Sequence, residues 1–170
     1  ADSQTPQGIV AVVQKEEVEQ TDFSQGKFLF LEDVQDPGNV GTIIRTVDAA
    51  GFTGVIVSDK SADIYSLKTL RSMQGSHFHL PIYRMSSQRL LEEAKEAAIP
   101  VLATTLSKDS VDYRELPPIE NFVLVMGNEG QGISPLMAES ADQLVHISMK
   151  GQAESLNVAV AAGVLIFHLS

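Results

Sequence analysis

Short apolar runs alternate with amphipathic segments along most of the chain. The runs at 28–31, 55–57, 101–105, 122–126 and 144–147 consist mainly of Val, Leu, Ile and Phe and end at polar turns, as buried parallel strands do. Two further strands are expected at 8–13 and 77–83, and helices at 40–50, 64–73 and 87–98, the last with Leu90, Leu91 and Ala94 facing inward. Ser134 and Pro135 have the residue types of an N-cap and first position, so they open a short helix. The alternation predicts one α/β domain: a parallel sheet with helices on both faces.

The C-terminal stretch, 146–168, differs from the other helical segments. A polar loop at 150–154 leads into a helix with Ser155 and Asn157 in its first turn, and beyond Asn157 the residues are almost all small and apolar. A helix that is apolar all round has no face for solvent, so we expect it to be buried on several sides. At about 14 residues it is shorter than the roughly 18 that a membrane span needs. The loop and the helix together are predicted to form the floor of a binding site.

Ligands of parallel α/β sheets bind beyond the carboxyl ends of the strands. The loops that leave those ends lie at 32–39, 104–107, 127–132 and 148–155, and they hold most of the chemically distinctive residues. Taken singly, each remains ambiguous. Asn39 reads as a helix N-cap, Ser155 and Asn157 as caps or site residues, and Arg45 as a surface cation or a paired functional one. The glycine-rich turn at 127–132 lacks the P-loop and dinucleotide patterns, although a glycine backbone can approach a flat ligand closely.

The charge and the composition of the chain limit the classes of function that it can have. The net charge of -10 argues against a general nucleic-acid binder, but residues 43–91 hold six basic and three acidic side chains, a local +3 that could steer a polyanion. The absence of cysteine agrees with a reducing compartment, and the polar start lacks the basic region of a signal peptide, so we expect a cytoplasmic protein. The histidines match no zinc spacing, and no metal is expected. They are His77, His79, His146 and His168.

Three ordered motifs carry a resemblance to a known family. They read Asn39-x-Gly41-x-x-x-Arg45, Gly127-Asn-Glu-Gly-x-Gly-Ile-Ser134 and Ile147-Ser-Met-x-Gly151-x-x-Glu-Ser-Leu-Asn-Val158. Together they resemble the SpoU (TrmH-type) RNA ribose 2'-O-methyltransferases of the SPOUT superfamily, over residues 28–169. The resemblance implies a deep C-terminal trefoil knot, a homodimer with the site near the subunit interface, and S-adenosyl-L-methionine as cofactor. It also implies methylation of a ribose 2'-hydroxyl in structured RNA.

The resemblance also implies the site residues. The expected cofactor-binding residues are Gly127, Ile147, Leu156, Thr104, Thr105, Asn128 and Met149. The expected catalytic residues are Arg45, Asn39, Glu129, Ser155 and Asn157. Arg45 corresponds to the arginine at the reacting hydroxyl, where it is either the proton acceptor or a cation that binds the adjacent phosphate. We favour the cation, because a guanidinium with a pKa above about 12 is a poor base. Glu129 is expected to pair with Arg45, within one chain or across two subunits.

The same resemblance leads to expectations for the RNA substrate and for the domain organisation. The expected RNA is 23S ribosomal RNA. The alternatives are tRNA, a non-enzymatic RNA- or nucleotide-binding module on the same fold, and an unrelated doubly wound domain for a small ligand. Residues 5–13 resemble the junction after which the ribosomal-RNA members begin their catalytic domain. We therefore expect residues 1–14 to be a tail and first strand that follow an N-terminal RNA-binding domain, and residues 15–170 to be the catalytic domain.

Overall fold

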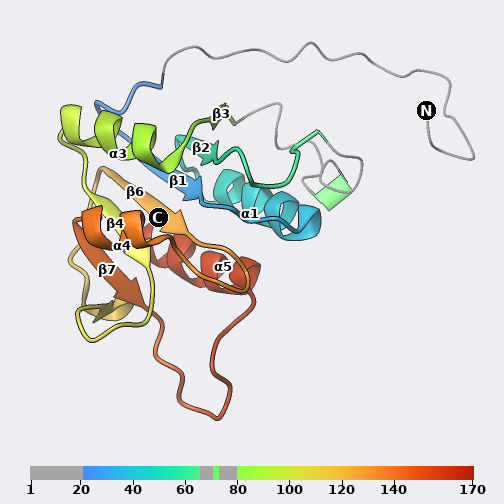
Figure 1. Ribbon diagram of the computed structural model, residues 1–170, viewed down its shortest axis with the longest axis vertical. Helices are drawn as coiled ribbons and strands as arrows, with labels where there is room; N and C mark the ends of the chain where they lie inside the picture. The colour runs from blue at the N-terminus through green and yellow to red at the C-terminus, as the bar shows by residue number, and fades with distance from the viewer. Residues whose placement is uncertain (1–20, 66–70, 73–79) are drawn as a thin grey trace, which may run out of the picture.

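Seven strands form one parallel sheet in the computed structural model, which describes residues 21–65, 71–72 and 80–170 (Figure 1). Their order across the sheet is β3-β2-β1-β6-β4-β7-β5. The strands are β1 (Lys27–Leu31), β2 (Gly54–Val57), β3 (Ile82–Arg84), β4 (Val101–Thr104), β5 (Val111–Asp112), β6 (Phe122–Met126) and β7 (Gln143–His146). The strand order reverses between β1 and β6, and such switch points are where open α/β sheets bind ligands.

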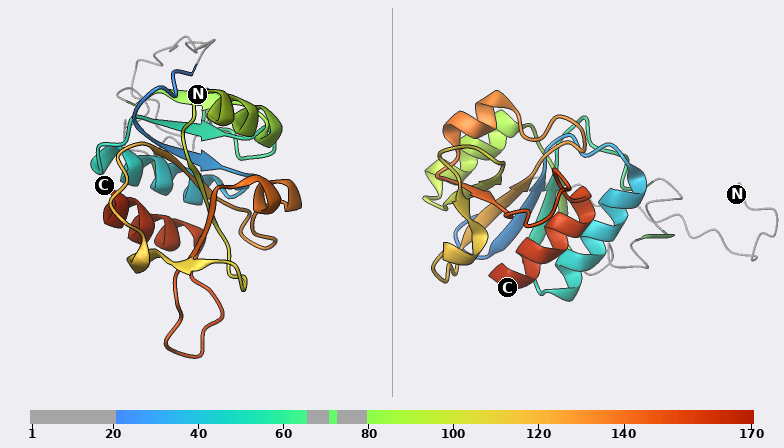
Figure 2. Two further views of the ribbon diagram at one scale, coloured as in Figure 1. Left: turned by 90° about the vertical axis from the view of Figure 1, so that its left-hand side faces the viewer. Right: turned by 90° about the horizontal axis from the view of Figure 1, so that it is seen from below.

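Helices cover both faces of this sheet, as the sequence predicts. On one face, α1 (Pro37–Ala49) and α5 (Val158–Leu169) pack side by side, and both contribute to one apolar cluster (Figure 2). On the other face, α3 (Ser87–Glu96) and α4 (Pro135–Ser140) bury Leu90 and Met137 in a second cluster. A short 3-10 helix, η2 (Tyr113–Glu115), follows β5. The predicted fold class is confirmed.

The central pair, β1 and β6, sets the position of the site. Each residue of β6 is buried, as are four of the five in β1, because both faces of the sheet are covered. Leu29 pairs with Leu124 and Leu31 with Met126 in parallel register. The two strands therefore end side by side, and the loops that follow them, 32–36 and 127–134, must meet beyond this edge.

The start of α1 differs from the sequence prediction. The helix begins at Pro37 rather than residue 40, and its N-cap is Asp36, whose carboxylate accepts the N–H of Asn39 at 3.0 Å. A proline suits the first turn of a helix, because its fixed φ is already helical and its missing N–H has no partner there. Asn39 is thus not the cap, and its side chain is available for other contacts. Ser134 caps α4 and Pro135 opens it, as predicted.

The prediction that the last helix is buried on several sides is wrong for the single chain. Only one face of α5 packs on the sheet and α1, and Val160 and Phe167 on the other side are 54% and 55% exposed. The helix also begins later than predicted. Asn157 is its N-cap and accepts the N–H of Ala159 at 2.8 Å, so Ser155 lies in the preceding loop.

The remaining boundaries shift by one or two residues. Helix α3 ends at Glu96, β4 ends at Thr104, and β7 spans Gln143–His146. The strand predicted at 8–13 and most of the helix predicted at 64–73 lie outside the described residues. The strand predicted at 77–83 is observed as β3, which spans Ile82–Arg84, and residues 77–79 lie outside the described residues. The two-residue strand β5 and η2 were not predicted, because elements this short carry no periodicity. No helix in the described part of the chain is long and apolar enough to cross a bilayer. The trefoil knot stays a prediction, because strand pairing alone does not define how the chain is threaded.

Candidate active site

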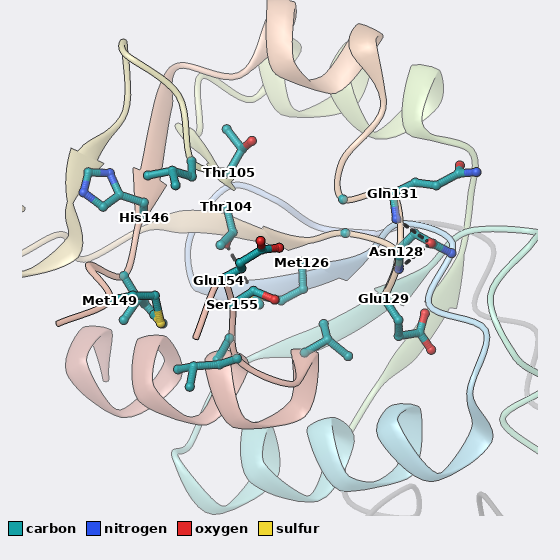
Figure 3. Close-up of a pocket in the computed structure, with 18 of the residues that line it drawn as sticks. Thr104, Thr105, Met126, Asn128, Glu129, Gln131, His146, Met149, Glu154 and Ser155 are labelled. Carbon is teal, nitrogen blue, oxygen red and sulfur yellow. Dashed lines mark hydrogen bonds between the residues drawn. The ribbon is translucent and has the colours of Figure 1, made fainter. Parts of the chain in front are cut away.

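A cavity of about 630 Å³ opens beyond the carboxyl ends of β4, β6 and β7 (Figure 3). Three separate loops line it through residues 104–106, 126–132, and 146–149 with 154–156, and Val158 and Ala161 of α5 complete the floor. All seven predicted cofactor-binding residues are among the lining residues. The residues expected from the sequence therefore lie in the walls of one cavity.

The wall after β6 is a tight hairpin closed by its own backbone. The N–H of Asn128 donates to the carbonyl of Gly132 at 3.0 Å, and the N–H of Gly132 donates to the carbonyl of Asn128 at 2.9 Å. The side-chain oxygen of Asn128 also accepts the N–H groups of Gly130 and Gln131. A Cβ on Gly127 would lie 2.4 Å from the backbone of Gly132 and Ile133. Only glycine fits at 127, because the hairpin folds back on it.

Glu129 fastens this hairpin to the loop between β1 and α1. Its two carboxylate oxygens accept the N–H groups of Gln35 at 3.0 Å and Asp36 at 2.7 Å. Partial burial acts to raise the pKa of Glu129, but these backbone N–H groups, with the side-chain amide of Asn39, outweigh burial and lower the pKa from its ordinary value. The predicted pairing with Arg45 within the chain is therefore wrong: the carboxylate is occupied by backbone donors of the neighbouring loop.

Glu32 holds the other end of the hairpin. This carboxylate is 2% exposed and accepts the N–H of Ser134 at 2.6 Å and its hydroxyl at 2.9 Å. The hydroxyl of Ser87, at the start of α3, is a third donor at 2.5 Å. A buried carboxylate needs such donors to offset its lost hydration. The end of β1 thus fixes where the hairpin enters α4.

Asn39 and Asn157 meet although 118 residues separate them. The amide nitrogen of Asn157 donates to the side-chain oxygen of Asn39 at 3.3 Å. The oxygen of Asn157 meanwhile caps α5 through the N–H groups of Ala159 and Val160. Both asparagines stand beside the cavity rather than in its lining. Asn157 therefore caps α5 and contacts Asn39 at the same time, whereas Ser155 lines the cavity without capping a helix.

Arg45 stands apart from the cavity within one chain. It lies on the exposed side of α1, and no residue in the described part of the chain forms an ion pair with it. It is absent from the residues that line the cavity. The structure brings Glu129 and Ser155 to the cavity, and Asn39 and Asn157 beside it, but does not bring Arg45 there.

Several lining residues were not predicted, among them Leu106, His146, Ser148 and Glu154. The signal for Glu154 was present, since it stands inside the third motif directly before Ser155. His146 and Ser148 line the cavity because the unpredicted strand β5 holds them. Ser110 lies 2.8 Å from His146 Nδ1, and Ser148 donates to Asp112 at 2.6 Å.

Asp112 accepts hydrogen bonds from both Ser148 and Arg114. Arg114 contacts both of its carboxylate oxygens, at 2.9 and 3.0 Å. The hydrogen bonds from Arg114 and Ser148 lower the pKa of Asp112 well below its usual range. Asp112 stays ionised at neutral pH and fixes the start of the loop that runs from β7 to α5. In the described residues, no group of three or more His, Asp and Glu side chains could hold a metal ion.

The chain matches known proteins along nearly its whole length. The model of the SpoU rRNA Methylase family matches residues 26–167. The 23S rRNA (guanosine(2553)-2'-O)-methyltransferase RlmP of Bacillus subtilis is 44% identical over 168 residues, covering 99% of this chain and 66% of that protein. The putative TrmH family tRNA/rRNA methyltransferase YacO of the same organism is 36% identical, covering 84% of this chain and 57% of that protein.

Solved structures of RNA methyltransferases have the same fold as this chain. The AdoMet-bound rRNA methyltransferase from Sinorhizobium meliloti superposes with a TM-score of 0.80 at 41% identity, over 84% of this chain and 55% of that one. This chain thus spans two thirds or less of the length of these relatives. The family match covers the three motifs and the cavity that the second and third of them line, so this chain belongs to the SpoU rRNA methylase family.

Proposed function

We propose that this chain is the catalytic part of a cytoplasmic RNA ribose 2'-O-methyltransferase that uses S-adenosylmethionine and acts on 23S ribosomal RNA. The observation that carries the proposal is the convergence of the three motifs. The second and third line one cavity, and the first reaches it through Asn39, which contacts both Asn157 and Glu129. The Bacillus subtilis relative is named a 23S rRNA 2'-O-methyltransferase, and this supports the choice of RNA.

The cavity suits the proposed cofactor in size and lining. Its volume of about 630 Å³ lies within the range of small-molecule sites, roughly 300–1,000 Å³. Apolar side chains such as Ile147 and Leu156 offer surfaces for an adenine, and the hairpin at Gly127 offers backbone groups close to it. When bound, S-adenosylmethionine would supply a methyl group made electrophilic by its sulfonium.

The chain's own residues would align the ribose and assist loss of its proton. Asn39 and Asn157 join the start of α1 to the start of α5, so they fix the rim of the cavity where a nucleotide would enter. We propose that Arg45 binds the phosphate beside the reacting ribose and favours the ionised 2'-hydroxyl by its charge. This role needs no change in its own protonation, whereas a role as base would need a large one.

We propose that a second copy of the chain completes the site. Arg45 is exposed on α1 and absent from the cavity of its own chain, while Val160 and Phe167 leave an apolar face on the adjacent helix α5. A homodimer formed through α1 and α5 would cover that face and bring the cation of one subunit toward the cavity of the other. Exposed apolar faces of this kind commonly mark interfaces.

We also propose that residues 15–170 form the catalytic domain of a longer protein with an RNA-binding domain before it. The curated relatives extend well beyond the region that this chain matches, which supports the proposal. Such a domain would supply RNA affinity that a chain with a net charge of -10 lacks. The native gene product, assayed with and without its additional residues for RNA affinity, tests this division.

The deciding experiment measures methyl transfer from labelled S-adenosylmethionine by the full-length protein to ribosomal RNA and to tRNA. Label in 23S RNA, mapped to a ribose 2'-oxygen by nuclease digestion and mass spectrometry, is the expected result. Label in tRNA alone would favour the second candidate function, a tRNA 2'-O-methyltransferase, which is consistent with the name of YacO as a putative tRNA/rRNA methyltransferase. Binding of RNA and cofactor without transfer would identify a non-enzymatic module.

A further inference from the structure

The charged groups around the cavity are unevenly distributed. Two carboxylates, Glu129 and Glu154, and the ring of His146 are the ionisable side chains among its lining residues. No Lys or Arg belongs to that lining in the described part of the chain. With His146 neutral, the lining therefore carries a charge of -2.

The two carboxylates differ in what they contact. Glu129 is held by the N–H groups of Gln35 and Asp36, which partly neutralise it. Glu154 has neither a hydrogen bond nor an ion pair with any residue in the described part of the chain. It lines the cavity together with Thr104 and Ser155, and Figure 3 shows its side chain among those that line it. Glu154 is thus the uncompensated charge of the site.

The two forms of the proposed cofactor differ in charge at one atom. The methyl donor has a positively charged sulfonium, whereas the spent cofactor, S-adenosylhomocysteine, has a neutral thioether in its place. A carboxylate in the cavity attracts the first form and has no charge to attract at that atom of the second. Glu154 is exposed to solvent, so water screens this attraction and its strength should be that of a solvent-accessible charge pair.

We propose that Glu154 is a specificity-determining residue that makes the cavity prefer the methyl donor to the spent cofactor. The proposal rests on the proposed function, since it concerns the same cavity and the same ligand. Its consequence is that the product of each turnover binds less tightly than the cofactor that must replace it.

The test is calorimetric binding of three ligands to the wild-type protein and to Glu154→Gln. The ligands are S-adenosylmethionine, S-adenosylhomocysteine and sinefungin, which has an amine-bearing carbon in place of the sulfonium. We expect the substitution to weaken the two ligands that are cationic at this position about three- to fivefold, the upper range for a solvent-accessible charge pair. The affinity for S-adenosylhomocysteine should change less than about twofold, and the difference should shrink at high salt.

Glu120→Gln is the matched control. It removes the same charge from an exposed position before the amino end of β6, at the opposite end of that strand from the cavity, and should leave all three affinities unchanged. Equal weakening of the three ligands by Glu154→Gln would overturn the proposal, because it would place the carboxylate at the amino-acid end that all three share. Unchanged affinities would overturn it as well. Failure of the wild-type protein to bind any of the three would instead refute the proposed function.

Discussion

Asn157 donates its amide to the side chain of Asn39 at 3.3 Å, while its oxygen caps α5. One side chain thus joins the first residue of the first motif to the last polar residue of the third. Because both helices pack on the same face of the sheet, this contact fixes the position of α1 relative to the loop that lines the cavity. Asn157 thus has two functions, the helix cap and the contact with Asn39, and different substitutions can remove them separately.

Asn157→Asp should keep the helix cap and lose the contact with Asn39. A carboxylate oxygen can still accept the N–H groups of Ala159 and Val160, but it cannot donate to Asn39. We expect methyl transfer to fall about three- to tenfold, the equivalent of one net hydrogen bond, with little change in melting temperature. Asn157→Ala should also lose the cap, and about 1 kcal/mol of stability with it. Equal loss of stability in both variants would contradict the separation.

Arg45→Ala should abolish methyl transfer while cofactor binding survives. Removing one charged group that stabilises a transition state costs on the order of a hundredfold or more in rate. The cofactor affinity, measured by calorimetry, should stay within about twofold of wild type, because Arg45 is absent from the cavity lining. Near-normal turnover by this variant would refute the assigned role.

Phe167→Asp should separate the proposed dimer into monomers. A carboxylate in the exposed apolar face of α5 would be buried without a partner in the interface, and light scattering should show half the mass. Leu136→Asp is the control, since Leu136 is also exposed, at 45%, but lies on α4 across the sheet. Mixing Arg45→Ala with Asn157→Ala subunits should raise transfer above the sum of the two separate variants if the site spans two subunits. No recovery in the mixture would place Arg45 and the cavity in the same subunit.

Glu129→Gln should remove a pH-dependent part of the stability. The folded-state pKa of Glu129 is lowered, so its ionised form stabilises the fold above the unfolded-state pKa, about 4.3, and this contribution is lost as the pH falls through the folded value. The difference in unfolding free energy between wild type and variant should therefore be constant near pH 7 and shrink below about pH 4.5. Urea titrations between pH 7 and pH 3 measure it. A difference that stays constant over that range would show that the carboxylate is not preferentially ionised in the folded state.

Gly127→Ala should distort the cofactor-binding hairpin. The added Cβ would meet backbone atoms of Gly132 and Ile133 at 2.4 Å, and backbone atoms cannot turn aside as a side chain can. We expect cofactor affinity to fall at least about tenfold. Gly130→Ala adds the same methyl group where its nearest neighbour is 3.7 Å away, so it should bind the cofactor normally. Equal effects of the two substitutions would mean that close backbone approach at Gly127 is unimportant.

The sequence by itself determined the elements whose signal is local. The apolar runs of β1 and β6 predicted buried parallel strands, because strands covered on both faces bury nearly all of their residues. The Ser-Pro pair predicted the start of α4, and the motif residues predicted the walls of the cavity. These features depend on a few neighbouring residues, so they can be read along the chain.

Only the tertiary structure decided which distant groups meet. The order of strands in the sheet brings the loops of the site together. Their meeting lets Glu129 accept the N–H groups of Gln35 and Asp36, and lets Asn157 contact Asn39. It also leaves Glu154 without a charged partner among the residues that the structure describes. The exposed side of α5 likewise depends on what packs against it, because an apolar sequence is compatible with a buried face and with an interface alike. Side-chain partners are set by distances across the fold, and the sequence of a single loop does not contain those distances.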